Sequence, residues 1–180
     1  MAEPSLRILA PRAKLRVQTW SIAALQDAQL RAALQELVGD SWPTTVGATA
    51  GSGSRPRILC LGPTEWLVVA ESPADALLRE VEQAVRGSSL NVTDQSQGLA
   101  ALEVSGPRAR ELITKGCCLD LHPRAFPLHA CARTRLAHVP VVIDAGTHAD
   151  RLTCYVARSY LDYLHRWLID AAAEFQDTNA

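Results

Sequence analysis

The sequence predicts an α+β protein made of two similar halves, each an antiparallel sheet with helices packed on one face. Strand and helix signals follow one another in the order βαββα and then ββαβββα. Each helical segment carries one apolar stripe, which is typical of a helix that lies against a sheet. Turns that contain proline and glycine separate the segments, as turn chemistry favours. The same arrangement is therefore expected twice along the chain.

We divide the 180-residue chain on this basis. Residues 1–14 are expected to form an irregular N-terminal arm, since they are mixed in character and broken by proline. Residues 15–90 form the first half, and residues 91–175 form the second. Residues 176–180 are expected to be a frayed tail, because chain ends are poorly ordered unless something ties them down.

The first half opens with a strand and a helix. Leu15 to Trp20 alternates apolar and polar residues, as a half-buried strand does. Asp27 is placed to cap a helix that runs to Val38, and Gly39 is placed to end it. The buried stripe of this helix consists of Leu30, Leu34, Leu37 and Val38.

Two more strands follow, at Arg57 to Leu61 and at Glu65 to Ala70. The turn Gly62-Pro63-Thr64 joins them. Trp66 lies in the second strand, where it could stack on a cofactor. We assign it to the core, because a tryptophan among valines and leucines more often packs inside.

A second helix of the first half begins with Ser72-Pro73. The serine is placed to cap it, and the proline suits its first position, where the missing N–H costs nothing. Gly87 is placed to end it. Its inward face consists of Leu77, Leu78, Val81 and Val85.

The clearest run of signals opens the second half. Leu99 to Val104 predicts a half-buried strand with Glu103 pointing outward. Pro107 is expected at the first position of a short helix, with Gly106 or Ser105 as its cap. The buried face of this helix consists of Ala109, Leu112 and Ile113.

The end of this short helix is also predicted. Arg108 and Glu111 can pair on its exposed side, three residues apart. Gly116 is expected to end it in the left-handed conformation, and Cys117 to Leu121 leads on into the next segment. The unit thus reads as strand, tight turn, short helix and strand.

Three strands and a helix complete the chain. The strands are expected over Ala132 to Leu136, Val139 to Ile143 and Arg151 to Ala157. Ser159 is placed to cap the last helix. The apolar stripe of that helix consists of Tyr160, Leu161, Leu164, Leu168, Ala171 and Ala172.

Composition excludes several classes of protein. The formal net charge of −1 argues against a general attraction to nucleic acid or to acidic membranes. The five cysteines are odd in number and lack the spacing of a disulfide framework, which indicates reduced thiols in a cytosol. The first residues do not read as a signal peptide, and no apolar run is long enough for a membrane span. We expect a cytoplasmic protein.

The cations are mostly arginine, with Lys14 and Lys115 the only lysines among 18 basic residues. A GC-rich genome explains this most simply. The alternative is a surface suited to bidentate contacts, because arginine serves interfaces better than lysine.

A group of thiols and imidazoles is the best candidate for a metal site. It consists of Cys117, Cys118, His122, His129 and Cys131. The spacing argues against metal binding, because there is no C-x-x-C pair and adjacent cysteines rarely ligate one tetrahedral ion. We expect buried thiols and ordinary loop histidines instead.

Three other patterns have residue types that could carry chemistry. Asp94 and Ser96 could serve as a base and a donor for a pterin or an amine, but a turn before a strand is preferred. Residues 47–54 form a glycine-rich loop or hairpin tip without a phosphate-binding fingerprint. Asp120 and His122 could be an acid–base pair. No catalytic, cofactor-binding or metal-binding residue is assigned.

The amino-acid sequences of several segments resemble those of the gamma subunit family of heterotetrameric sarcosine oxidase. The segments are C-L-G-P-T-E-W-L at 60–67, V-T-D-Q-S through H-P-R-A-F-P at 92–127, residues 131–136, Y-V-A-R-S-Y at 155–160, Tyr163-Leu164 and Trp167-Leu168. The resemblance covers about residues 57–170. Thr64 stands where the family pattern suggests an acid, and His165 where it suggests an aromatic residue. These departures point to a divergent branch.

The resemblance implies a fold related to the folate-binding domain of aminomethyltransferases. It also implies a four-subunit complex that oxidatively demethylates sarcosine to glycine, passes the one-carbon unit to tetrahydrofolate and forms hydrogen peroxide. In that complex the alpha subunit carries NAD and the folate site, and the beta subunit carries FAD. A covalent FMN lies between alpha and beta, and a delta subunit binds zinc. The gamma subunit carries no cofactor and packs against alpha.

Two classes of function follow. The first is a structural, non-catalytic subunit of sarcosine oxidase, or of a related N-methyl amino acid oxidase or dehydrogenase. The second is a free-standing folate-dependent one-carbon transfer protein, which rests on fold analogy alone. It would need an acid to hold the pterin, and Asp94 is the candidate.

Overall fold

The computed structural model describes residues 4–10, 12–51 and 53–175. The strands are β1 (Ser5–Ile8), β2 (Ala13–Thr19), β3 (Thr49–Ala50), β4 (Arg57–Gly62), β5 (Glu65–Ala70), β6 (Leu90–Asp94), β7 (Leu99–Ser105), β8 (Cys131–Leu136), β9 (Val139–Asp144) and β10 (Arg151–Ala157). The helices are α1 (Ala28–Val38), α2 (Ala74–Ala84), α3 (Ala109–Thr114) and α4 (Leu161–Ala173). Two short 3₁₀ helices are η1 (Ile22–Gln26) and η2 (Arg158–Tyr160).

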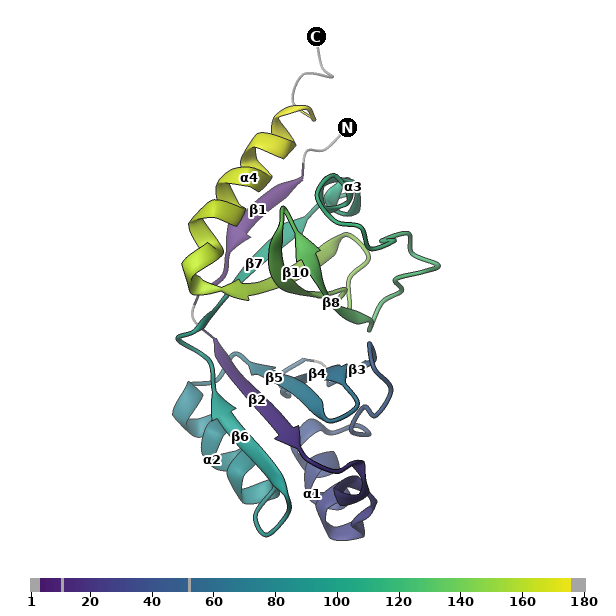
Figure 1. Ribbon diagram of the computed structural model, residues 1–180, viewed down its shortest axis with the longest axis vertical. Coiled ribbons are helices and arrows are strands. Elements are labelled where there is room, and N and C mark those ends of the chain that lie inside the picture. Colours follow the sequence, from purple (N-terminus) through teal and green to yellow (C-terminus); the bar gives the residue numbers. More distant parts are fainter. Residues whose placement is uncertain (1–3, 11, 52, 176–180) are drawn as a thin grey trace. The chain divides into compact units, whose positions relative to one another are not determined.

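The described residues divide into two compact units (Figure 1). One lies within Pro11–Gln97, and the other within Met1–Ala10 together with Gly98–Ala180. The division expected from the sequence lay between residues 90 and 91. In the structure, β6 pairs with β2 and so lies in the same unit as that strand. Residues 4–10 are described, whereas the expected tail at 176–180 lies outside the described residues.

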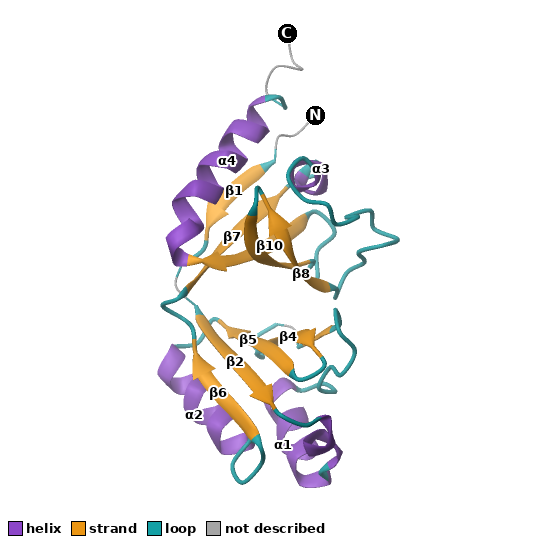
Figure 2. Cartoon of the chain, viewed as in Figure 1, coloured by secondary structure: helices purple, strands orange, loops and turns teal. Residues whose placement is uncertain are grey.

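The unit within Pro11–Gln97 is a five-stranded antiparallel sheet in the order β3-β4-β5-β2-β6. Helices α1 and α2 cover one face of it (Figure 2). Their leucines and valines pack against the residues of β2, β4 and β5 that point to that face, with Trp66 completely buried. The assignment of Trp66 to the core is confirmed. Its Nε1 donates to the carbonyl of Pro43 at 2.7 Å.

The second unit is also a five-stranded antiparallel sheet, in the order β1-β7-β10-β9-β8. Helices α3 and α4 share one core with it. Leu112 and Ile113 of α3 and Leu164 and Leu168 of α4 are fully buried there. The predicted α+β class, with two antiparallel sheets that each carry helices on one face, is confirmed.

The N-terminal segment is the main difference from the predicted order of elements. Residues 5–8 form β1, an edge strand paired with β7, where an irregular arm was expected. The prediction for this part was wrong because a short edge strand of mixed character has no strong period of its own. The pairing with a strand about a hundred residues further along supplies its hydrogen bonds.

The predicted cap of α1 is confirmed. The side chain of Asp27 accepts hydrogen bonds from the backbone N–H groups of Gln29 at 2.8 Å and Leu30 at 3.0 Å. Gly39 ends the helix with φ of 72°, a left-handed conformation that glycine adopts without strain. The serine expected to cap α2 does not do so, because Pro73 itself holds the cap position and its carbonyl accepts from Leu77.

The ends of α3 also differ from the prediction. The chain first makes a turn in which the N–H of Ala109 donates to the carbonyl of Gly106, so α3 begins at Ala109 and Pro107 lies before it. At the other end, the N–H of Gly116 donates to the carbonyl of Ile113, which is a tight 3₁₀-type turn. Gly116 is not left-handed. The predicted Arg108–Glu111 ion pair is present at 2.7 Å.

Helix α4 begins at Leu161, one residue later than a cap at Ser159 would place it. Ser159 lies inside η2 and makes no capping hydrogen bond, and Tyr160 is 45% exposed rather than part of the buried stripe. Beyond its other end Phe175 is buried, with Cζ of Arg108 3.9 Å and Nζ of Lys115 4.0 Å from the centre of its ring. No helix in the described part of the chain is both long and apolar enough to cross a membrane.

Candidate functional site

The thiols and imidazoles weighed as a metal site do not come together. Cys117 and Cys131 are buried, whereas Cys118 is exposed. The Sγ atom of Cys117 lies 3.7 Å from the hydroxyl of Thr134, and so faces β8. Within residues 4–10, 12–51 and 53–175, no group of three or more His, Cys, Asp or Glu side chains is placed to hold a metal ion.

Asp94 and Ser96 form a turn rather than a ligand-facing pair. The carboxylate of Asp94 accepts hydrogen bonds from the backbone N–H of Ser96 at 2.8 Å and from its hydroxyl. The hydroxyl in turn accepts from the backbone N–H of Lys14 at 2.9 Å. Ser96 is buried. These groups therefore join the ends of β6 and β2, which is the turn interpretation preferred from the sequence.

The pair Asp120 and His122 also has a structural role. The carboxylate of Asp120 accepts from the backbone N–H of His122 at 2.9 Å, and His122 Nδ1 accepts from the backbone N–H of Arg124 at 3.3 Å. The two side chains thus shape the backbone of one loop. Neither contact has the geometry of an acid–base pair acting on a substrate.

Within the expected glycine-rich loop at 47–54, Thr49–Ala50 form β3, and the glycines that follow lie in the connection to β4, with which β3 pairs antiparallel. Gly51 has φ of 81°, and a Cβ atom built on it would overlap the carbonyl oxygen of Pro56. The carbonyl of Gly51 accepts from Arg57 at 3.3 Å. Glycine is thus required at this position by a close approach of the backbone, as in a hairpin tip.

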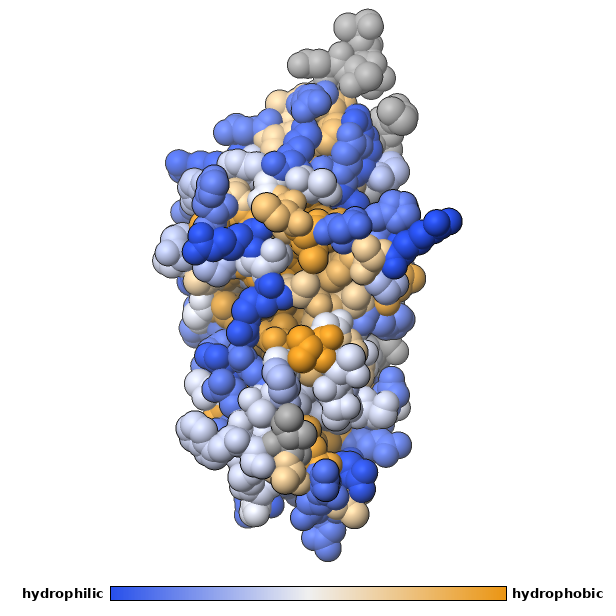
Figure 3. Space-filling model, turned by 45° about the vertical axis from the view of Figure 1, so that its right-hand side comes forward, coloured by the Kyte–Doolittle hydropathy of each residue, from blue (hydrophilic) through white to orange (hydrophobic). Residues whose placement is uncertain are grey.

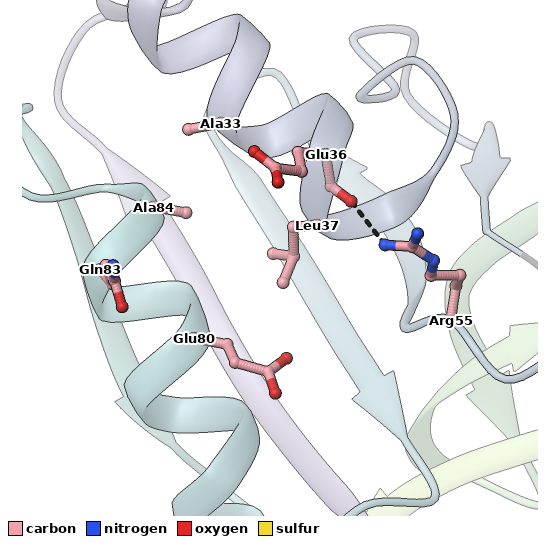
Figure 4. Close-up of a pocket in the computed structure, with 7 residues that line it drawn as sticks. All are labelled: Ala33, Glu36, Leu37, Arg55, Glu80, Gln83 and Ala84. Carbon is pink, nitrogen blue, oxygen red and sulfur yellow. Dashed lines mark hydrogen bonds between the residues drawn. The ribbon is translucent and has the colours of Figure 1, made fainter.

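A hollow in the first unit lies between α1 and α2 (Figure 4). It has a volume of about 450 Å³ and is lined by Ala33, Glu36, Leu37, Arg55, Glu80, Gln83 and Ala84. Arg55 donates to the carbonyl of Glu36 at 2.6 Å, which satisfies a carbonyl at the end of α1. The hollow has no nucleophile beside a base, so its geometry offers contacts for a basic side chain rather than a reaction.

Large apolar side chains also reach the surface. Figure 3 shows hydrophobic residues in patches among hydrophilic ones on the face that it displays. The exposed ones are Ile8, Trp20, Val46, Leu128, Tyr160, Tyr163 and Ile169. Trp20 is the most exposed at 87%. Aromatic side chains of this kind are enriched where proteins bind each other.

Comparison with known proteins identifies the family. The model of the sarcosine oxidase, gamma subunit family, matches residues 22–174. Sarcosine oxidase subunit gamma from Corynebacterium sp. (strain P-1) is 38% identical over 146 residues, which cover 80% of this chain and 70% of the relative. The subunit gamma from Arthrobacter sp is 36% identical over 146 residues, with the same coverage.

The chain belongs to the sarcosine oxidase gamma subunit family.

Solved structures agree with this gamma subunit assignment. A chain of heterotetrameric sarcosine oxidase from Corynebacterium sp. U-96, in complex with pyrrole 2-carboxylate, matches with a TM-score of 0.86 and 31% identity. The match covers 98% of this chain and 87% of that chain. Aminomethyltransferase T of the glycine cleavage system from Bartonella henselae matches with a TM-score of 0.66 over 93% of this chain and 46% of that one. At 15% identity it shows the fold alone, and confirms the expected fold relation.

Two polar features of this gamma subunit were missed from the sequence. Glu103 was expected to point outward, but it is 7% exposed. Its carboxylate pairs with Arg7 of β1 at 2.9 Å and with Arg151 of β10 at 3.5 Å. Because β7 lies between β1 and β10, both neighbours can bring an arginine to it. No local pattern could have shown this, since Arg7 lay in a segment read as irregular.

The second missed feature is Arg110 of α3. Its Nη1 donates to the carbonyl of Leu121 at 2.7 Å and to the carbonyl of Phe126 at 2.9 Å. Burial lowers the pKa of Arg110, and the nearby Asp150 opposes that effect. Nothing in the sequence around Arg110 indicated that its side chain would bind carbonyls of a loop some ten residues further along. Its position on α3 decides the contact.

Proposed function

We propose that this chain is a structural subunit, without catalytic residues of its own, in a heterotetrameric sarcosine oxidase. That complex would oxidatively demethylate sarcosine to glycine, transfer the one-carbon unit to tetrahydrofolate and form hydrogen peroxide. The observation that carries the proposal is the match to a chain of heterotetrameric sarcosine oxidase over 98% of this chain. The family assignment and the relatives named subunit gamma support it.

The partners and cofactors are part of the same proposal. We infer direct contact with the alpha subunit, and a complex completed by beta and delta. NAD, the tetrahydrofolate site, FAD, FMN and zinc would belong to those subunits. The residues weighed as a cofactor site in this chain make turns and core contacts instead. The free state of all five cysteines supports a cytoplasmic location.

The relatives favour the gamma subunit over a subunit of an N-methyl amino acid dehydrogenase and over a free-standing folate-dependent protein. The aminomethyltransferase likeness covers less than half of that enzyme. The acid required by the folate hypothesis, Asp94, already accepts two hydrogen bonds from Ser96.

A co-purification tests the proposal. The tagged chain is isolated from its native cells at moderate salt, and the accompanying subunits and the visible spectrum are recorded. We expect three further subunits and a flavin spectrum. A colourless chain without partners would contradict the proposal, and folate titration of the wild type and of Asp94→Ala would then examine the other function.

A further inference from the structure

The hollow between α1 and α2 has an apolar part that is open to an incoming side chain. Its volume of about 450 Å³ falls within the usual range of binding pockets, roughly 300–1,000 Å³. Ala33, Leu37 and Ala84 line it and are partly buried. Leu37 and Ala84 also pack against the core of their unit. Because two of these three residues are alanines, their small side chains leave space between the helices, and an aliphatic chain laid there is covered from water.

Each of the two helices contributes one carboxylate to this hollow, Glu36 from α1 and Glu80 from α2. Figure 4 shows both side chains turned toward the space between the helices. Neither carboxylate makes an ion pair within the part of the chain that the structure describes. Five other glutamates do pair with a cation, namely Glu65, Glu71, Glu103, Glu111 and Glu174. The hollow thus presents two negative charges that the described chain leaves unpaired.

The end of α1 gives the hollow further negative character, because the last carbonyls of a helix carry a partial negative charge. The chain's own Arg55 already binds one of them. Its Nη1 donates to the carbonyl of Glu36 at 2.6 Å, as the dashed line in Figure 4 marks. This hydrogen bond goes to the backbone and not to a carboxylate. A guanidinium group therefore suits this environment, and the carboxylates of Glu36 and Glu80 are left for a second one.

The exposed apolar side chains elsewhere on the chain, such as Trp20 and Ile169, do not define a partner in this way. Single apolar side chains at a surface are normal and need no special explanation. A hollow with an apolar lining and a carboxylate on each side has a definite complement, which is a long side chain with an aliphatic stem and a cationic head. Arginine fits better than lysine, because its planar fork of donors can serve two carboxylates and because it is enriched at interfaces.

We propose that the hollow between α1 and α2 receives an arginine side chain of the alpha subunit. The aliphatic stem of that arginine packs on Leu37, and its guanidinium donates to Glu36 and Glu80. The occupant is alpha because the proposed function infers direct contact with that subunit alone. The inference rests on the proposed function, and adds to it the place of contact and the type of residue that alpha supplies.

Two matched double variants test the role of the charges. Glu36→Gln/Glu80→Gln keeps the size of both side chains and removes both charges from the hollow. Glu82→Gln/Asp170→Asn removes two carboxylates that are also exposed and do not line the hollow. Each tagged variant is expressed in the native cells together with the untagged wild-type chain. The tagged share of the purified complex is then compared with that of a tagged wild-type control, and thermal unfolding of each free variant verifies that it is folded.

We expect the Glu36→Gln/Glu80→Gln variant to enter the complex about tenfold less than the tagged wild type, since loss of one partner of a buried charge pair at an interface costs at least this much. We expect the Glu82→Gln/Asp170→Asn variant to enter as the wild type does. The single variants Glu36→Gln and Glu80→Gln provide milder changes at the same place. Equal entry of the two folded double variants would overturn the inference.

Cross-linking in the assembled complex identifies the occupant. Gln83, which lines the hollow from α2, is replaced by the photoreactive residue benzoylphenylalanine. After irradiation, mass spectrometry identifies the attached chain and peptide. We expect a peptide of the alpha subunit that contains an arginine. Attachment to beta, to delta or to a second copy of this chain, or no attachment, would overturn the inference. If the tagged wild type brings down no other subunit, the proposed function itself fails.

Discussion

Gly116 shows how one residue can be required for a reason that its sequence position does not reveal. It follows α3 and lies against the ring of Trp167 from α4. A Cβ atom built on it would lie 2.8 Å from Cζ2 of that ring, closer than real Cβ contacts come. Its φ is not in the left-handed region, so the space and not the backbone conformation demands glycine. Trp167 belongs to the side chains packed on the core of this unit.

The variant Gly116→Ala is therefore expected to lower the free energy of unfolding by about 1–3 kcal/mol, the usual cost of overpacking. Chemical denaturation measures the effect. Gly62→Ala is the control, because its nearest neighbour would be Cβ of Glu65 at an ordinary 3.7 Å. An equal effect of the two substitutions would show that the ring does not limit the space at Gly116.

Burial of the Cys154 thiol makes the free energy of unfolding depend on pH. Burial raises the pKa of this thiol from 9.0 to about 12, and the neighbouring Cys117 adds to the effect. The folded state thus favours the protonated thiol more than the unfolded state does. Its contribution to stability is fully present below pH 9 and is lost as the pH rises from about 9 to about 12.

We expect the free energy of unfolding to fall in that window, with a contribution from this group of at most about 1.4 kcal/mol per pH unit. Comparing the pH dependence of the wild type with that of Cys154→Ala isolates the thiol, since all other groups are common to both. Parallel curves from pH 8 to pH 11 would contradict the assignment.

At the scale of single elements, the two helices of the first unit begin in different ways. The carboxylate of Asp27 satisfies two N–H groups at the start of α1. Helix α2 has no side-chain cap, and Ser72 lies exposed beside Pro73. The sequence suggested a cap at both helices, because Ser72-Pro73 has the residue types that favour one. The backbone around Pro73 decided otherwise.

Asp27→Ala is accordingly expected to lower the free energy of unfolding by about 0.5–2 kcal/mol. The matched variant Ser72→Ala is expected to change it by less than about 0.5 kcal/mol, as surface substitutions usually do. Urea denaturation of both variants measures the difference. A loss of stability in Ser72→Ala as large as that in Asp27→Ala would mean that the serine caps α2 in solution.

At the scale of the whole molecule, one of the two units is built from both ends of the chain, which the sequence did not predict. The first strand belongs to the sheet of the C-terminal segment, and the chain then builds the unit within Pro11–Gln97 before returning. Strand β1 supplies backbone partners to β7 and places Arg7 beside Glu103. Without it, the buried carboxylate would keep only the longer contact to Arg151.

Removal of residues 1–9 is expected to speed amide hydrogen exchange in β7 and β10, because an edge of their sheet is lost. Mass spectrometry of peptides from these strands measures the change. Arg7→Gln is the control, since it keeps the strand and removes only the ion pair. Unchanged protection of β7 after the truncation would show that β1 does not contribute to this sheet in solution.

Much of the fold and little of the site could be predicted. The order of strands and helices follows from local period, caps and turns, which act over a few residues, so β5 and β10 were placed with their observed bounds. The family could be inferred because its segments stand in order along the chain. The roles of the candidate site residues became clear only from the structure. A thiol, a carboxylate or an imidazole is the same residue type in the sequence whether it holds a turn or reacts with a substrate.

Patterns in the sequence were enough to infer the α+β class, the repeated arrangement of sheet and helices, and the family. The contact between Arg7 and Glu103 could be seen only in the folded chain, since the two residues lie 96 positions apart. Only the folded chain also showed that Arg110 holds the loop between α3 and β8 and that Trp167 limits Gly116. The physical reason is the range of the interactions: periodicity and capping are local, whereas cross-strand pairs, buried charges and close packing join residues that only the complete fold brings together.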